Sequence, residues 1–193
     1  INWLRVYNSL HSLPPEERIE PSRKRQINRA IKNGVTTQVT GNEEEINAFL
    51  RILKRNYSSK LRNHFPDLQL FRLLMQKYPE KETARIFLVK YGQKVIGGAF
   101  CLFSGENAYL GFSGGMNKTY PLLSPNTMAV WAAITYAFER KYQHFEFADA
   151  GLPFQKMGYR NFILSFGGKQ VSTRRWFRFR WNWLNSLLIK VYR

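Results

Sequence analysis

The chain has 193 residues, enough for one domain with a substantial core, and its 44% hydrophobic and 22% charged residues are ordinary for a globular protein. Thirty lysines and arginines against thirteen acidic residues give a formal net charge of +17, which attracts polyanions such as nucleic acid, anionic lipid or phosphorylated substrates. The single cysteine, Cys101, excludes an internal disulfide and a thiolate metal cluster, and no apolar run approaches the ~20 residues that a membrane-spanning helix needs.

The first predicted elements are a helix and a strand. The stretch 18–34 carries helix-starting residues near its beginning and Gly34 at its end, so it predicts a helix. Ile27 and Ile31 are four residues apart and are expected to mark its inner side. The β-branched run 35–40 then predicts a strand.

The next segment predicts two further helices and a change to strand periodicity. Asn42 is expected to cap a helix over 43–60, whose first turn is acidic and whose end is basic, as the helix dipole prefers. A third helix is predicted over 66–79. Three strands joined by tight turns follow over 84–115, and the central one is nearly all apolar, which predicts burial on both faces.

The C-terminal part alternates helices and strands. An apolar helix is predicted after Ser124 and Pro125, and its composition favours packing against the sheet. A short strand is expected over 144–150, a loop and helix over 153–166, and a last strand over 169–181. A final short helix is expected from 182 onward.

These elements predict a mixed α/β (α+β) layout in one domain over residues 1–193. Because the chain begins at Ile1 rather than Met, we expect it to be a piece of a longer protein. Cys101 lies in the apolar run GGAFCLF, which predicts a buried, inert thiol and favours a reducing, cytoplasmic setting.

The order of these elements resembles the GNAT acyltransferase fold, and the residues are most similar to its FemAB-like group and acetyltransferase relatives. The resemblance is carried by RKRQINRAIKNGV, VKYGQKVIGGAFCLF, YLGFSGG, the stretch from SPNTMAVWAAITYAFERKY into HFEFADA, and NFILSFGGK. It implies a mixed central sheet flanked by helices, in which neighbouring strands splay apart and the acyl donor enters the gap. It also implies transfer of an acyl group to an amine. FemAB-like enzymes take the group from aminoacyl-tRNA and extend the peptide of a cell-wall precursor. Many of them carry two GNAT-like domains, and the resemblance implies that this chain matches the second one and is the C-terminal part of a longer chain.

Two features depart from the family pattern. CoA-dependent members place a Gly-rich loop before the central helix, but NKTYPLLSPN has no glycine, and Gly114 and Gly115 lie earlier, at a strand end. We therefore expect a turn and a capped helix start rather than a standard CoA-phosphate cradle, although a helix N-terminus still attracts anions. FemAB-like proteins often show Phe-Lys-x-x-Phe-Gly before the last strand, and Ile163 stands where that lysine would be. The acyl donor is thus either aminoacyl-tRNA or acyl-CoA, with no permanently bound cofactor.

Acyl transfer to an amine needs a group that accepts the amine proton and a group that protonates the leaving group. Asp149 ends the predicted strand 144–150 on the face of two phenylalanines, where apolar surroundings would raise the pKa of a base. The alternative for Asp149 is a loop carboxylate that caps the backbone. Tyr159 occupies the region where GNAT enzymes commonly carry a tyrosine general acid, and its alternative is a packing role.

Other polar residues are candidates for substrate contact. Four of them lie between the last strand of 84–115 and the start of the apolar helix, and two cations lie in the loop and helix 153–166. They are Tyr109, Ser113, Lys118, Asn126, Lys156 and Arg160. Lys156 or Arg160 would supply the positive charge of the FemAB-like lysine that Ile163 replaces. The three histidines are far apart and form no ligand pattern, so we predict no metal.

The C-terminal region is strongly basic. Nine lysines and arginines and no acidic residue follow Asp149, and RRWFRFRW over 174–181 alternates arginine with aromatics. This pattern suits single-stranded nucleic acid or an anionic membrane surface, whereas its apolar face is expected to pack on the sheet. The predicted partners are therefore an anionic substrate, tRNA or a phosphorylated cell-wall precursor, handled at the inner face of the membrane. The competing hypotheses are a non-catalytic nucleic-acid-binding module and a degenerate transferase half.

Overall fold

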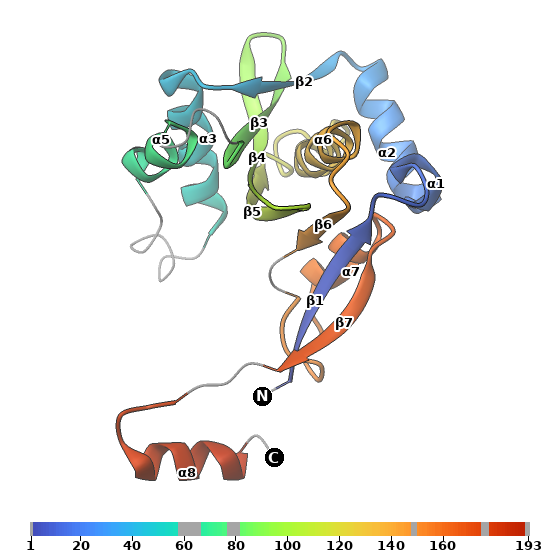
Figure 1. The fold of residues 1–193 in the computed structure, drawn as a ribbon. Helices are drawn as coiled ribbons and strands as arrows, with labels where there is room; N and C mark the ends of the chain where they lie inside the picture. The colour runs from blue at the N-terminus through green and yellow to red at the C-terminus, as the bar shows by residue number, and fades with distance from the viewer. Residues whose placement is uncertain (1, 58–66, 77–81, 148–149, 175–177, 192–193) are drawn as a thin grey trace.

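The strands form one seven-stranded sheet in the order β2-β3-β4-β5-β6-β1-β7 (Figure 1). The computed structural model describes residues 2–57, 67–76, 82–147, 150–174 and 178–191. The strands are β1 (Asn2–Ser9), β2 (Val35–Thr40), β3 (Ala84–Tyr91), β4 (Lys94–Ser104), β5 (Asn107–Gly115), β6 (His144–Phe147) and β7 (Lys169–Arg174). The helices are α1 (Pro15–Arg18), α2 (Pro21–Lys32), α3 (Glu43–Asn56), α5 (Leu68–Gln76), α6 (Pro125–Glu139), α7 (Gly158–Leu164) and α8 (Asn182–Val191).

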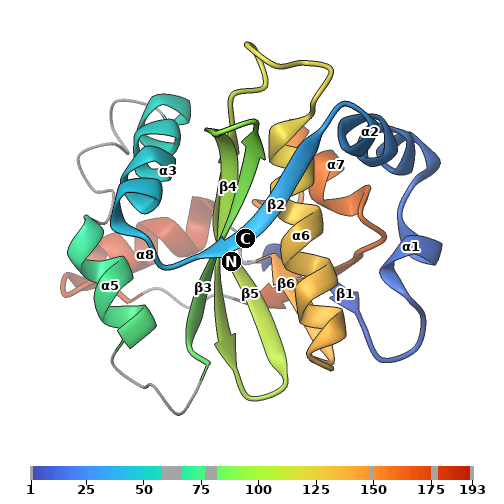
Figure 2. The same ribbon diagram turned by 90° about the horizontal axis from the view of Figure 1, so that it is seen from above.

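Most of the predicted elements are confirmed, and so is the mixed sheet flanked by helices. β3, β4 and β5 form the predicted antiparallel meander, and β5 then pairs in parallel with β6 through the crossover helix α6. α2 and α6 cover one face of the sheet, and α3 and α5 cover the other (Figure 2). Each face has its own hydrophobic cluster, so the central strands are buried on both sides.

Cys101 of β4 belongs to the cluster beneath α6 and is completely buried, as predicted. Burial disfavours the thiolate and raises the pKa of the Cys101 thiol far above its ordinary range. This side chain is therefore a packing residue without nucleophilic character at neutral pH.

The sequence analysis did not identify β1. This strand lies between β6 and β7 and pairs antiparallel with both, so that Val6 is opposite Phe147 on one side and Gln170 on the other. Its inward side chains Leu4 and Val6 are buried with period two. The N-terminal strand thus links the last strand to the centre of the sheet.

Two expectations about side-chain placement and one about the length of the last strand are wrong. Ile31 of α2 is exposed, and Ala30 is the residue that turns inward beside Ile27. The last strand ends at Arg174 rather than at 181, and 175–177 lie outside the described residues. Phe179 and Trp181, expected to pack on the sheet, are exposed.

None of the described helices is long and apolar enough to cross a bilayer.

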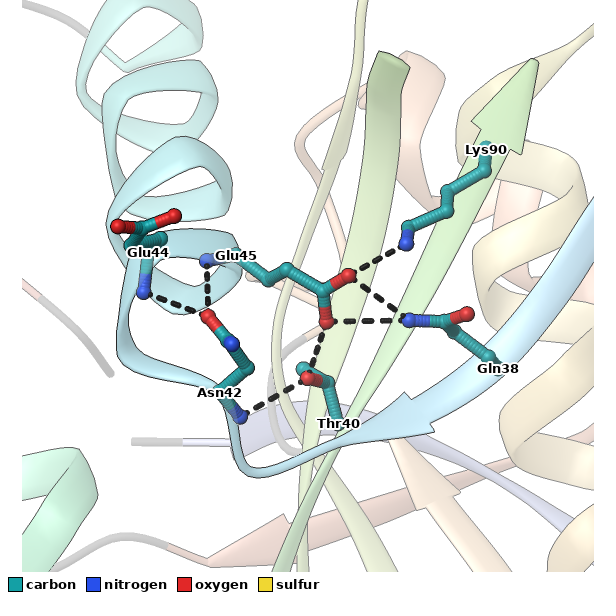
Figure 3. A network of polar contacts seen from close by, with 6 residues as sticks. All are labelled: Gln38, Thr40, Asn42, Glu44, Glu45 and Lys90. Carbon is teal, nitrogen blue, oxygen red and sulfur yellow. Dashed lines mark hydrogen bonds and ion pairs between the residues drawn. The ribbon is translucent and has the colours of Figure 1, made fainter. Parts of the chain in front are cut away.

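A polar network fixes the start of α3 against the edge of the sheet (Figure 3). The Asn42 side chain accepts hydrogen bonds from the backbone N–H groups of Glu44 and Glu45, which confirms the predicted cap. The Glu45 carboxylate in turn accepts hydrogen bonds from Lys90, Thr40 and Gln38, the last at 3.0 Å to both oxygens. The hydrogen bond from Lys90, followed by that from Thr40, lowers the pKa of Glu45 below its ordinary value. The network joins α3 to β2 and β3.

Glu45→Gln is expected to lower the free energy of unfolding by about 1–2 kcal/mol at neutral pH, towards the low end for hydrogen bonds to a charged group because the carboxylate is partly exposed to solvent. Because the pKa is depressed in the folded state, this stabilisation is complete above the ordinary pKa and is lost as pH falls through the folded value. Urea unfolding of both proteins between pH 7 and about pH 3 should therefore show their difference shrink only in acid. Glu44→Gln is the matched control, since the Glu44 carboxylate points away from the network in Figure 3. An equal loss in both variants would contradict the assignment.

Candidate active site

The parallel pair β5–β6 is short and ends where β5 is irregular. The register runs from Asn107 opposite His144 to Leu110 opposite Phe147. The register between β4 and β5 shifts at the next residue, Gly111, which forms a bulge in β5. Beyond this bulge β5 continues beside β4, whereas β6 is paired with β1 on its other side, and Ala150 N–H also bonds to β1 by donating to the Leu4 carbonyl.

A cavity of about 1070 Å³ opens beside the part of β5 that follows the bulge. Its walls come from the end of α3, from β5 and its following loop, from the start of α6 and from the region before and within α7. The lining residues are Arg55, Asn56, Tyr57, Leu110, Gly111, Phe112, Ser113, Gly114, Gly115, Met116, Asn117, Lys118, Thr119, Asn126, Met157 and Tyr159. Segments that are distant in sequence therefore meet at one end of β5.

Four of the predicted site residues meet in this cavity: Ser113, Lys118, Asn126 and Tyr159. Tyr159 stacks on Phe162 with ring centroids 6.2 Å apart, which holds the ring at the start of α7. Asp149 lies outside the described residues, and its role as a base stays a prediction.

The other three candidates lie elsewhere. Tyr109 lies in the paired part of β5, and its hydroxyl accepts a hydrogen bond from the Asn107 side chain at 3.2 Å. Lys156 and Arg160 line a second hollow of about 530 Å³, which shares Met157 with the larger cavity. The candidate residues therefore divide between two neighbouring depressions and the sheet.

Arg160 holds the loop that follows Asp149. Its guanidinium donates hydrogen bonds to the carbonyl oxygens of Ala150 at 2.7 Å and Leu152 at 2.5 Å. These bonds give Arg160 a positioning role, and its contact with substrate stays a prediction.

Gly114 and Gly115 allow two helices to approach the end of β5. A Cβ at Gly115 would lie 2.6 Å from the backbone nitrogen of Asn126, and one at Gly114 would lie 2.9 Å from the Leu53 side chain. The distance at Gly115 is too short for any side chain, so α6 packs directly on the strand backbone, whereas at Gly114 the Leu53 side chain of α3 rests on the strand. The glycine pair thus serves close packing at the wall of the cavity.

The start of α6 is capped from a distance. Ser124 has a left-handed conformation and its side chain makes no capping bond, whereas the Asn117 side chain accepts a hydrogen bond from Asn126 N–H at 3.2 Å. The expected turn and capped helix start are confirmed, with Asn117 as the capping side chain. The buried Oδ1 of Asn126 has no hydrogen-bond partner among the described residues. The N-terminal turn of α6 lines the cavity through Asn126, and the positive end of the helix dipole favours negative charge there.

The sequence analysis missed the three residues from the end of α3. Asn56 donates a hydrogen bond to the Gly115 carbonyl at 3.0 Å and so joins α3 to β5. Burial raises the pKa of Tyr57, which keeps its phenol protonated at neutral pH. Arg55 at the end of α3 and Lys118 in the loop after β5 bring two cations to the lining of the cavity. The basic helix end was visible in the sequence, but its partner β5 lies more than fifty residues away.

Ile163 is completely buried in α7, so the position that carries a lysine in FemAB-like proteins belongs to the hydrophobic core here. Lys118 and Arg55 are the cations that line the cavity instead. Within the described ranges, no three His, Cys, Asp or Glu side chains gather as a potential metal site.

A mixed sheet with a short central parallel pair, a cavity where that pairing ends and a helix start at its wall together define the GNAT fold. The chain belongs to the acetyltransferase (GNAT) domain family, whose family model matches residues 21–156. A comparison with curated protein sequences found no match.

Similar solved structures share this fold at low identity. FemX is 15% identical with a TM-score of 0.70, covering 86% of this chain and 59% of the FemX chain. L-PGS from Bacillus licheniformis is 11% identical with a TM-score of 0.63, covering 98% of this chain and 64% of the other. The C-terminal domain of a putative lysylphosphatidylglycerol synthetase from Agrobacterium fabrum is 10% identical with a TM-score of 0.55, covering 88% and 58%. The chain thus spans about three fifths of the length of these structures.

Proposed function

We propose that this domain transfers an acyl or aminoacyl group to an amine acceptor in the cavity beside β5. The observation that carries the proposal is the position of the cavity, at the point where the parallel pairing of β5 and β6 ends. Ser113, Lys118 and Tyr159 converge there from three segments. A flat basic surface without a pocket would have favoured a nucleic-acid-binding module.

The proposed reaction follows from the residue types. The acceptor nitrogen attacks the donor carbonyl carbon and forms the amide bond, while the bond from that carbon to the leaving oxygen or sulfur breaks. Asp149 takes the proton that the amine loses, and Tyr159 gives a proton to the leaving group. Backbone N–H groups of β5 and the nearby cations stabilise the negative charge on the carbonyl oxygen.

The charge supports an anionic substrate. A +17 chain with Arg55 and Lys118 at the cavity favours tRNA as donor or a phosphorylated cell-wall precursor as acceptor. Acyl-CoA is the alternative donor, since the start of α6 attracts phosphate even without a Gly-rich loop. One similar structure is named for an aminoacylated lipid, lysylphosphatidylglycerol, which agrees with aminoacyl transfer near the inner face of a membrane.

Thermal unfolding with acetyl-CoA, CoA, bulk tRNA and a UDP-linked muramyl pentapeptide tests the proposal. A ligand at about a hundred times its dissociation constant adds roughly 2.7 kcal/mol and raises the melting temperature. A shift with CoA identifies an acyl-CoA enzyme, and a shift with tRNA or the pentapeptide supports the FemAB-like hypothesis. Lys118→Ala should weaken any such shift, whereas Lys24→Ala on exposed α2 should not. If no ligand stabilises the protein, a degenerate transferase half becomes the better hypothesis.

A further inference from the structure

α8 is an amphipathic helix that buries none of its described side chains. Helical spacing places four apolar residues on one face, the exposed Trp183 and Leu187 and the half-buried Leu184 and Leu188. The other face carries polar residues and the exposed Ile189. Trp183 is 65% exposed and Leu187 is 51% exposed. Figure 1 shows α8 set apart from the sheet, beyond the ends of β1 and β7. A helix of this pattern ordinarily packs its apolar face against something.

The segment before α8 is held against it as part of the same unit. The Asn185 side chain accepts a hydrogen bond from Phe179 N–H at 2.7 Å and donates one to the Phe179 carbonyl at 2.9 Å. The Trp181 carbonyl accepts from Leu184 N–H at 3.2 Å and so starts the helix. Trp181 itself is 61% exposed. Two exposed aromatics, Phe179 and Trp181, therefore belong to the segment that is held against α8.

The charged side chains of residues 178–191 are all basic. Arg178 and Arg180 are exposed beside the two aromatics, and Lys190 lies at the end of α8. No acidic residue follows Asp149 in the sequence, so no acidic residue within this segment neutralises these cations. The surface combines tryptophan, leucine and basic side chains, which is the composition of helices that lie in a membrane interface.

We infer that α8 and residues 178–181 dock onto an anionic lipid bilayer, with the apolar face of α8 inserted at the level of the headgroups and the arginines on lipid phosphates. The three leucines favour lipid over nucleic acid, because leucine fills an acyl region but gives bases no ring to stack on. The surface is separate from the residues of the proposed acyl-transfer cavity, so this inference goes beyond the proposed function.

Sedimentation with lipid vesicles tests the inference on the whole chain. We expect binding to vesicles of phosphatidylcholine with phosphatidylglycerol, little binding to phosphatidylcholine alone, and weaker binding as salt is raised. The double variant Trp183→Ser with Leu187→Gln should bind at least tenfold more weakly, as should Arg178→Gln with Arg180→Gln. The matched controls are Leu122→Gln, at an exposed apolar residue in the loop before α6, and Lys24→Gln with Arg25→Gln on α2. Both controls should bind like the original chain.

Several results would overturn the inference. The α8 variant could bind vesicles as tightly as the original chain, or the α2 charge variant could lose as much binding as the 178–180 variant. If the α8 variant or the 178–180 variant lost tRNA binding but still bound vesicles, the surface would be assigned to nucleic acid. Sedimentation velocity adds a last outcome, since a dimer that dissociates in the α8 variant without any vesicle binding would make a second copy the partner of this face. Ligand-induced thermal shifts at the cavity are read separately, so the proposed function is judged independently.

Discussion

Gly115→Ala is expected to lower the free energy of unfolding by about 2–3 kcal/mol, near the upper range for overpacking a well-filled site. The added Cβ would lie 2.6 Å from the Asn126 backbone nitrogen and 3.1 Å from the Pro125 Cβ, and neither belongs to a flexible side-chain end. Either α6 shifts away from β5 or the strand bends. Since Gly115 and Asn126 both line the cavity, the same shift should also weaken ligand binding there.

The measurement is urea unfolding of the two proteins, with the midpoint expected to fall and the slope to stay constant. For a chain of this size the melting temperature should drop by roughly 5–10 °C. Gly41→Ala is the control, because nothing lies within 4 Å of a Cβ at Gly41 and its backbone is not left-handed. That variant should be within about 0.5 kcal/mol of the original chain. Equal stability of Gly115→Ala and the original chain would show that α6 does not rest on β5 as described.

The elements that could be predicted are those whose signals are local. The meander from β3 to β5 carries its turns within a few residues, and the Asn42 cap needs only the helix that follows it. β1 was missed because its partners lie far along the chain, with Val6 opposite Phe147 and Gln170. A strand of this kind is defined by tertiary pairing, and its buried residues Leu4 and Val6 are too few to form a distinct pattern.

The site was predictable in part for the same reason. Ser113, Lys118 and Asn126 are close in sequence, at the end of a strand and the start of a helix, and the fold keeps them together. Arg55 and Tyr57 come from another part of the chain, and only the packing of α3 on β5 places them there. Gly114 and Gly115 show what the residue type alone cannot predict, because a phosphate-binding loop and a close helix contact both require glycine.

Tyr159→Phe is expected to reduce kcat for acyl transfer by roughly a hundredfold or more, the usual contribution of a general acid. Phenylalanine keeps the ring that stacks on Phe162 and removes only the hydroxyl, so this packing at the start of α7 should be retained. KM should change little, because the role assigned to the hydroxyl arises as the leaving group departs. Steady-state kinetics with the donor identified by thermal unfolding provides the measurement.

The size of this effect should depend on the leaving group, and the dependence separates a catalytic tyrosine from a structural one. An aminoacyl ester of tRNA releases an alkoxide, which needs a proton as it leaves. Acyl-CoA releases a thiolate, which leaves more readily without a proton because thiols are acidic, with an ordinary pKa of about 8.5 for cysteine. The hydroxyl should therefore matter much more with the ester than with the thioester. Tyr109→Phe is the control, since the Tyr109 hydroxyl bonds to Asn107 in the paired part of β5, away from the cavity. A large loss of kcat in Tyr57→Phe with no loss in Tyr159→Phe would transfer the acid role to Tyr57. Burial raises the pKa of Tyr57, so its phenol is protonated at neutral pH.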